Sequence, residues 1–220
     1  MRTDVRVPAG RVMASILRLL IAGVVAIGTV ACATFDRPRS VEAGFWIERL
    51  TYDLIGLGGP MTVGELALVE SAALDEIRRA FAGVAVRFSP RRDARYAVTV
   101  VQHLYDLRVR RTSEVFGNAR AMRGFGGRGS VNFYAVASAA AAYAPANATR
   151  QDVIGAIGRG VGRVAIHEFT HLFLPRAPID ASADPLSYEY GHAGRREQYY
   201  GELRWGFAKA MLLRELGPDP

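Results

Sequence analysis

The sequence predicts one globular domain of the α+β class, formed by residues 45–220. Three observations lead to this prediction. Half of the 220 residues are hydrophobic, which is enough for one sizeable core. Two segments combine a capping signal with apolar residues at helical spacing. Short segments around them are rich in β-branched and aromatic residues, as strands are.

Residues 1–31 have the pattern of an export signal. Four arginines precede an apolar run, Leu19–Val30, which is shorter than the roughly 20 residues that a stable membrane span needs. The run ends at Cys32, the only cysteine, which excludes an intrachain disulfide. The residues before it, GTVA, resemble a bacterial lipobox, in which the cysteine is lipidated; ordinary cleavage after Ala33 is the alternative.

The lipobox resemblance implies a lipoprotein that is tethered to a membrane through Cys32. We therefore expect the protein in the cell envelope, at the periplasmic or extracytoplasmic face. Residues 32–44 then form a linker to the domain.

The net charge of +7 raises the question of nucleic-acid binding. The export signal carries four arginines and one aspartate, a net +3, so +4 remains on the rest of the chain. A Gly/Arg-rich segment, Gly117–Gly129, places arginines around Phe125 and could contact nucleic acid. Because the chain carries an export signal, we expect no nucleic-acid partner and interpret this segment as a flexible loop.

The first half of the domain is predicted as strand, helix, strand, strand. Thr62 and Glu65 form a capping box, and apolar residues at helical spacing continue from there to Phe81. The predicted strands are Phe45–Leu57, Val84–Phe88 and Tyr96–Leu104.

The second half begins with a long polar segment, Asp106–Ser130, which is predicted as a loop. Val131–Val136 is predicted as one more strand. Thr149 and Asp152 form a second capping signal and open a long helix. The final segment, Arg195–Leu216, has apolar residues at helical intervals and is predicted as a closing helix.

The long helix ends in the segment VAIHEFTHLFLP, which contains an HExxH motif. His167 and His171 are four residues apart, so both imidazoles project from one face of a helix and can bind the same metal ion. Glu168 lies next to the first histidine, where a carboxylate can take a proton from water on the metal. A buried helix with ordinarily hydrogen-bonded histidines is the alternative interpretation.

The chain from Leu50 to Leu174 resembles the zincin metallopeptidases, in particular the matrixin-like metzincins, in its order of elements and in the HExxH motif. The resemblance implies a small mixed β-sheet packed on a backing helix and an HExxH helix, with Zn²⁺ as cofactor. It also implies an edge strand beside the cleft that pairs with an extended substrate, a role we assign to Val131–Val136.

The third zinc ligand departs from the metzincin pattern. Metzincins place glycine and histidine three and six residues after the second motif histidine, where this chain has Leu174 and Ala177. Asp180 is the first acidic residue beyond the turn, and aspartate is the third ligand in the aspzincins, so Asp180 is our first choice. The alternatives that stay open are Glu189, His192 and Glu197.

Two tyrosines follow the motif closely enough to act in the same site. A phenol hydroxyl of Tyr188 or Tyr190 could donate a hydrogen bond to the oxyanion that forms during peptide hydrolysis. Packing and capping roles are the alternative for both residues.

The sequence thus predicts an exported zinc-dependent metallopeptidase that acts on a peptide or protein substrate. The alternative is a non-catalytic envelope lipoprotein that binds zinc and holds a partner in the same cleft. The oligomeric state is not predicted.

Overall fold

The computed structural model describes residues 40–104, 115–122, 126–192 and 194–219. The export segment, Cys32 and the first part of the expected linker lie outside the described residues, as does Phe125 of the Gly/Arg-rich segment. The description below concerns the compact unit Ser40–Pro220. None of the helices within the described residues combines the length and the apolar character that a membrane crossing requires.

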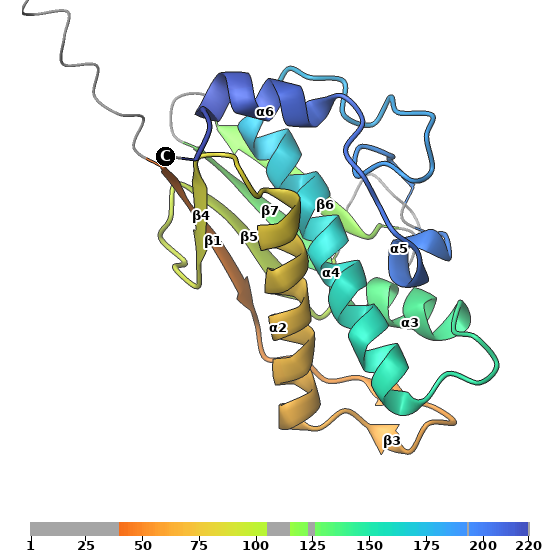
Figure 1. Ribbon diagram of the computed structural model, residues 1–220. Helices are drawn as coiled ribbons and strands as arrows, with labels where there is room; N and C mark the ends of the chain where they lie inside the picture. The colour runs from red at the N-terminus through yellow and green to blue at the C-terminus, as the bar shows by residue number, and fades with distance from the viewer. Residues whose placement is uncertain (1–39, 105–114, 123–125, 193, 220) are drawn as a thin grey trace, which may run out of the picture. The chain divides into compact units, whose positions relative to one another are not determined.

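A mixed five-stranded β-sheet forms one layer of this unit (Figure 1), which confirms the mixed α and β architecture. The strand order is β4-β1-β5-β7-β6. β6 is antiparallel to β7, whereas the pairs β1 with β4, β1 with β5 and β5 with β7 are parallel. The strands are β1 Val41–Ile47, β4 Val86–Ser89, β5 Tyr96–Val101, β6 Gly117–Met122 and β7 Gly126–Asn132.

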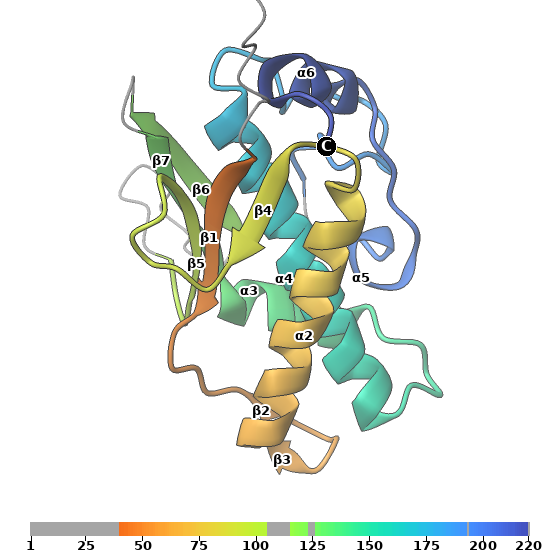
Figure 2. The same ribbon diagram turned by 60° about the vertical axis from the view of Figure 1, so that its left-hand side comes forward.

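Two long helices, α2 and α4, lie side by side against one face of the sheet (Figures 1 and 2). The hydrophobic core lies between these helices and the sheet and includes Phe45, Ile77, Val98, Ile157 and Phe169, which are all fully buried. The helices are α2 Val63–Ala80, α3 Phe133–Ala142, α4 Arg150–Phe173, α5 Glu197–Tyr200 and α6 Ala208–Leu216, and a two-stranded hairpin is formed by β2 Asp53–Leu54 and β3 Gly59–Pro60.

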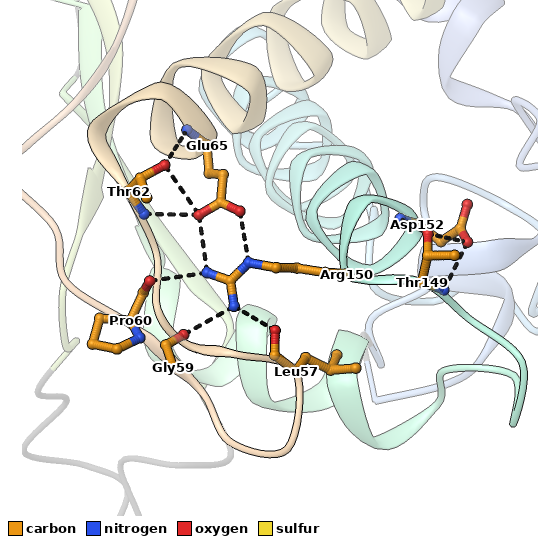
Figure 3. Close-up of polar contacts among 8 residues, drawn as sticks. All are labelled: Leu57, Gly59, Pro60, Thr62, Glu65, Thr149, Arg150 and Asp152. Atoms are coloured by element: carbon orange, nitrogen blue, oxygen red, sulfur yellow. Dashed lines mark hydrogen bonds and ion pairs between the residues drawn. The ribbon is translucent and has the colours of Figure 1, made fainter.

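Both long helices begin at the predicted capping boxes (Figure 3). The hydroxyl of Thr62 accepts from the backbone N–H of Glu65, and the Glu65 carboxylate accepts from the backbone N–H of Thr62 at 2.8 Å. Thr149 and Asp152 make the same pair of bonds at the start of α4. Each box satisfies N–H groups that the first helical turn leaves without partners, so local sequence fixes where both helices begin.

Arg150, the first residue of α4, ties the helix starts together (Figure 3). Its guanidinium donates to the Glu65 carboxylate at 2.6 Å and to the carbonyl oxygens of Leu57, Gly59 and Pro60 at 2.7 to 3.0 Å. The hydrogen bonds from Arg150 and Thr62 lower the pKa of Glu65 to about 2, so this carboxylate is ionised at neutral pH. The ion pair therefore anchors α4, α2 and the β2–β3 hairpin to one another.

Small residues allow α2 and α4 to approach closely. A Cβ atom added to Gly162 would lie 2.7 Å from the carbonyl oxygen of Ala73, and one added to Gly158 would lie 2.6 Å from the Cβ of Ala72. These glycines therefore bring the two helix backbones nearer than larger side chains would permit.

The predicted first strand is displaced towards the N-terminus. β1 starts at Val41, inside the segment expected as a linker, and ends at Ile47, so the prediction of a strand through Leu57 is wrong. The following residues, Glu48 and Arg49, are exposed and do not continue the strand.

The prediction of an edge strand at Val131–Val136 is also wrong. β7 ends at Asn132 and lies inside the sheet, paired with β5 and β6. The side chain of Asn132 accepts from the N–H of Ala135 and starts α3 at Phe133, so the same apolar run is divided between a strand and a helix. β6 forms one edge of the sheet and β4 the other. Because β6 lies inside Asp106–Ser130, the prediction of a loop over that whole segment is wrong.

The C-terminal segment does not form one closing helix. It contains α5 and, after an irregular stretch, α6. Gly201 ends α5 in an extended conformation, and this break divides the helix predicted for Arg195–Leu216.

Candidate metal centre

Helix α4 carries the HExxH motif in its last turns. Leu174 leaves helical geometry, and Pro175, which has no N–H to continue the hydrogen-bond ladder, follows it. His167, Glu168 and His171 all line one cavity. The motif is therefore helical and faces a cavity, as its spacing predicts.

Asp180 reaches the motif through the turn that follows α4. The N–H of Ala181 donates to the carbonyl of Pro178, and the fully buried side chain of Ile179 anchors the turn in the core. An antiparallel bridge joins Ala181 to Tyr190 on the next loop. These contacts hold Asp180 beside the end of α4 although nine residues separate it from His171.

Three ligand atoms converge at this point. The Nε2 atoms of His167 and His171 are 3.1 Å apart, and Asp180 Oδ1 lies 3.0 Å from the first and 3.4 Å from the second. Within the described residues, these three side chains form a group of potential metal ligands whose atoms all lie within 4.8 Å of one another. Two imidazoles and a carboxylate that point to one place can hold a metal ion.

The backbone orients His167 for this role. Its Nδ1 lies 2.9 Å from the carbonyl oxygen of Tyr188. Because a carbonyl oxygen can only accept, Nδ1 is the donor, and in the neutral ring the lone pair of Nε2 then faces the other two ligands. Metal-binding histidines are commonly held by such a second hydrogen bond.

The three ligand residues shift one another's pKa values. When His167 is protonated, its Nε2 donates to Asp180, and this hydrogen bond lowers the pKa of Asp180 to about 2, so Asp180 is anionic at neutral pH. Burial alone would lower the pKa of His167, but the hydrogen bond to Asp180 and the charge of Glu168 outweigh it and raise this pKa. Burial and the neighbouring His167 lower the pKa of His171.

Glu168 is buried beside the triad and belongs to the cavity wall. Burial raises the pKa of its carboxyl group to about 7, which is close to the value that proton transfer near neutral pH requires. Gly117 of β6 makes room for it, because a Cβ atom there would overlap with the Glu168 carboxylate and lie 2.7 Å from Val164 Cγ1. A glycine in the strand thus permits the position of the carboxylate.

The cavity has a volume of about 740 Å³ and joins the triad to the edge of the sheet. β6 forms one wall through Gly117, Asn118 and Ala119. The loop after α4 also lines the cavity, through residues that include Tyr190 and His192. The strand beside the cavity is therefore β6, whereas the prediction placed it at Val131–Val136.

The two tyrosines have different environments. Both line the cavity, but the hydroxyl of Tyr188 donates to Glu76 at 3.0 Å, which argues against the expected role as an oxyanion donor, and the backbone carbonyl of Tyr188 lies 2.9 Å from His167 Nδ1. Tyr190 lines the cavity, and its ring lies 4.5 Å from the guanidinium carbon of Arg195. The oxyanion role expected for Tyr190 stays a prediction.

The alternative third ligands lie outside the triad. Glu189 is fully buried and accepts hydrogen bonds from the Ser187 hydroxyl and from the backbone N–H groups that lead into α6, so it supports the C-terminal segment. His192 is exposed and its ring contacts Tyr190. Glu197 is the first residue of α5. Asp180 is the alternative that the fold brings to both histidines.

The sequence did not lead us to two buried charged residues near the centre. Glu76 and Arg163 are 2% and 3% exposed, and Arg163 Nε donates to Glu76 Oε1 at 2.8 Å. The signal was present in the sequence, because Glu76 interrupts the apolar stripe of α2 and Arg163 lies one turn before His167.

Comparison of the chain with family models, with curated proteins and with solved structures found no match.

Proposed function

We propose that this protein is an exported zinc-dependent metallopeptidase. The observation that carries the proposal is the convergence of His167, His171 and Asp180 in a cavity that also contains the buried carboxylate of Glu168. Imidazole and carboxylate ligands suit Zn²⁺, and three protein ligands are typical of catalytic zinc sites, which keep a position open. A Zn²⁺ ion there would polarise the scissile carbonyl and make water more acidic.

Glu168 supplies the proton transfers. It accepts a proton from the attacking water and later gives a proton to the leaving amine nitrogen. A carboxyl group with a pKa of about 7 can serve both steps near neutral pH, because its two protonation states are then similar in energy. Tyr190, which lines the same cavity, is our candidate for a hydrogen bond to the oxyanion.

The edge strand supports a peptide as substrate. β6 ends the strand order of the sheet, and its first residues, Gly117, Asn118 and Ala119, line the cavity. An extended peptide can add to such an edge through backbone hydrogen bonds. This would place a peptide bond beside the triad, as the zincin resemblance implies.

Replacement of Glu168 by glutamine tests the proposal. Glu168→Gln keeps the size of the side chain but cannot accept the proton, so hydrolysis of a peptide library should fall by at least about a hundredfold while zinc stays bound. Glu197→Gln is the matched control, because Glu197 belongs to α5, and it should keep full activity. Undiminished hydrolysis by Glu168→Gln would refute the mechanism, and bound zinc without any cleavage by the wild type would favour a non-catalytic binding protein.

Export and lipid anchoring are part of the proposal and are supported by the lipobox-like residues before Cys32. Cys32→Ser should shift the full-length protein from the membrane fraction to the soluble fraction of the cell envelope. Equal membrane association of the variant and the wild type would contradict lipid attachment at Cys32.

A further inference from the structure

A buried polar cluster contacts the metal centre through Tyr188. It is formed by Glu76 of α2, Arg163 of α4 and the hydroxyl of Tyr188. Both Arg163 Nε, at 2.8 Å, and the Tyr188 hydroxyl, at 3.0 Å, donate to the same carboxylate oxygen, Glu76 Oε1. The second carboxylate oxygen accepts from Arg79 at the surface. Buried charges are tolerated when they are paired and hydrogen-bonded in this way.

Arg163 extends the cluster to the C-terminal segment. Its two terminal nitrogens donate to the backbone carbonyl oxygens of Glu197, at 2.8 Å, and Gly201, at 3.0 Å. The guanidinium therefore joins α4 to both ends of α5. The close contact of α2 with Gly162 places Glu76 within reach of this arginine, because a Cβ on Gly162 would lie 2.9 Å from Glu76 Cβ.

Tyr188 is held at both its side chain and its backbone. Its hydroxyl donates to Glu76, its N–H donates to the carbonyl of Arg204 at 3.0 Å, and its own carbonyl accepts from His167 at 2.9 Å. Burial and the nearby charge of Glu76 raise the pKa of Tyr188, so the phenol stays protonated and remains a donor. The side chain is thus fixed in the core while the carbonyl faces the metal ligand.

We propose that Glu76 is a positioning residue for the metal centre: through the Tyr188 hydroxyl it fixes the carbonyl that orients His167. Glu76 lies on α2, 112 residues before Tyr188 in the chain, and has no place in the HExxH motif. The inference rests on the metal site of the proposed function and is independent of peptide cleavage.

A role in positioning differs from a role in packing by its effect on metal affinity. Loss of the hydrogen bond lets the Tyr188 carbonyl move, so the Nε2 of His167 is held less firmly for the metal. A bond that only stabilises the fold changes the unfolding temperature and leaves the affinity of the folded protein for zinc unchanged.

The test is the zinc dissociation constant of the full chain, measured by competition with a chelator. Tyr188→Phe removes only the hydroxyl that donates, and Glu76→Met removes both acceptor oxygens while keeping the length of the side chain. Each should weaken zinc binding about tenfold, the lower end of the range for residues that support metal ligands. The double variant should also lose about tenfold, because both changes break the same connection.

Tyr52→Phe is the matched control, since the Tyr52 hydroxyl donates to the hydroxyl of Ser138 at 3.1 Å, away from the triad. It should keep the wild-type zinc affinity within about twofold. The inference is overturned if Tyr188→Phe also binds zinc like the wild type, or if the two losses multiply to about a hundredfold.

The outcomes separate this inference from the proposed function. Zinc binding without peptide cleavage would refute the peptidase and leave the role of Glu76 intact. Cleavage by the wild type combined with an unchanged zinc affinity of Tyr188→Phe would refute only the role of Glu76. A wild-type chain that binds no zinc would refute both.

Discussion

The close approach of α2 and α4 leads us to expect opposite effects on stability when Gly162 and Gly155, both in α4, are replaced by alanine. In Gly162→Ala, the new Cβ would lie 2.7 Å from the carbonyl oxygen of Ala73, 2.9 Å from Glu76 Cβ and 3.1 Å from Ala73 Cα. Two of these three atoms are backbone, so α2 as a whole must move away. In Gly155→Ala, the nearest atom is the flexible guanidinium of Arg159 at 3.7 Å, an ordinary contact.

The magnitudes follow from two opposing terms. Replacement of glycine by alanine inside a helix contributes about 1 kcal/mol of stability. Overpacking costs about 1–3 kcal/mol, and contacts with backbone place Gly162 in the upper half of that range. We therefore expect Gly162→Ala to lose about 1–2 kcal/mol and Gly155→Ala to gain about 0.5–1 kcal/mol.

Thermal and urea unfolding of the metal-free protein measure both effects. A domain of this size changes its Tm by about 2–4 °C per kcal/mol, so Gly162→Ala should unfold about 2–8 °C below the wild type. Gly155→Ala should unfold about 1–4 °C above it. A Gly162→Ala protein as stable as the wild type would refute the close contact between α2 and α4, and with it the path by which Glu76 reaches Arg163.

Three further predictions concern the site and its support. Gly117→Ala should lower peptide hydrolysis about tenfold to a hundredfold with zinc retained, because the methyl group displaces the Glu168 carboxylate; equal activity in a peptide assay would contradict this. Glu189→Ala should lower the free energy of unfolding in urea by about 3 kcal/mol, because it leaves buried N–H groups unsatisfied. Its zinc content should stay unchanged, and a folded variant without zinc would indicate that Glu189 is a ligand instead. Zinc affinity should fall about tenfold per pH unit below the raised pKa of His167, because zinc must then displace a proton, and it should not change with pH above that pKa. Chelator competition between about pH 5 and 8 measures this dependence. A zinc affinity that is constant down to pH 5 would contradict the prediction.

Local signals predicted the helices of the site correctly. The capping boxes at Thr62 and Thr149 depend on residues three positions apart, and α2 and α4 begin where these boxes predict. The HExxH spacing likewise concerns a single helical turn. Features that depend on neighbouring residues in the chain could therefore be derived without the fold.

Long-range pairing explains what the sequence did not reveal. β6 and β7 are rich in glycine and arginine and have little strand propensity. They are strands because β6 pairs with β7, and β7 pairs with β5. Gly127 permits a close approach to α4 and β6, because a Cβ there would lie 2.6 Å from the Leu172 side chain and 3.0 Å from the carbonyl oxygen of Arg120. The apolar run at Val131 fits a strand or a buried helix equally well, and Asn132 divides it.

The same contrast between local signals and long-range contacts applies to the residues of the site. Asp180 was predicted from its chemistry and reach, and the turn brings it to the histidines. The acidic alternative Glu189 has suitable chemistry, but Ser187 and the segment before α6 use its carboxylate. The direction of the Tyr188 hydroxyl depends on Glu76, which lies 112 residues away, so no local pattern could predict it.

The zinc content of Asp180→Ala tests the central claim most directly. Asp184→Ala is the matched control, because the Asp184 carboxylate pairs with Arg204 and lies outside the triad. The wild type and the control should each hold about one zinc ion per chain after removal of loose metal, and Asp180→Ala should lose it. An Asp180→Ala protein that holds zinc as tightly as the wild type would contradict the His167, His171 and Asp180 centre.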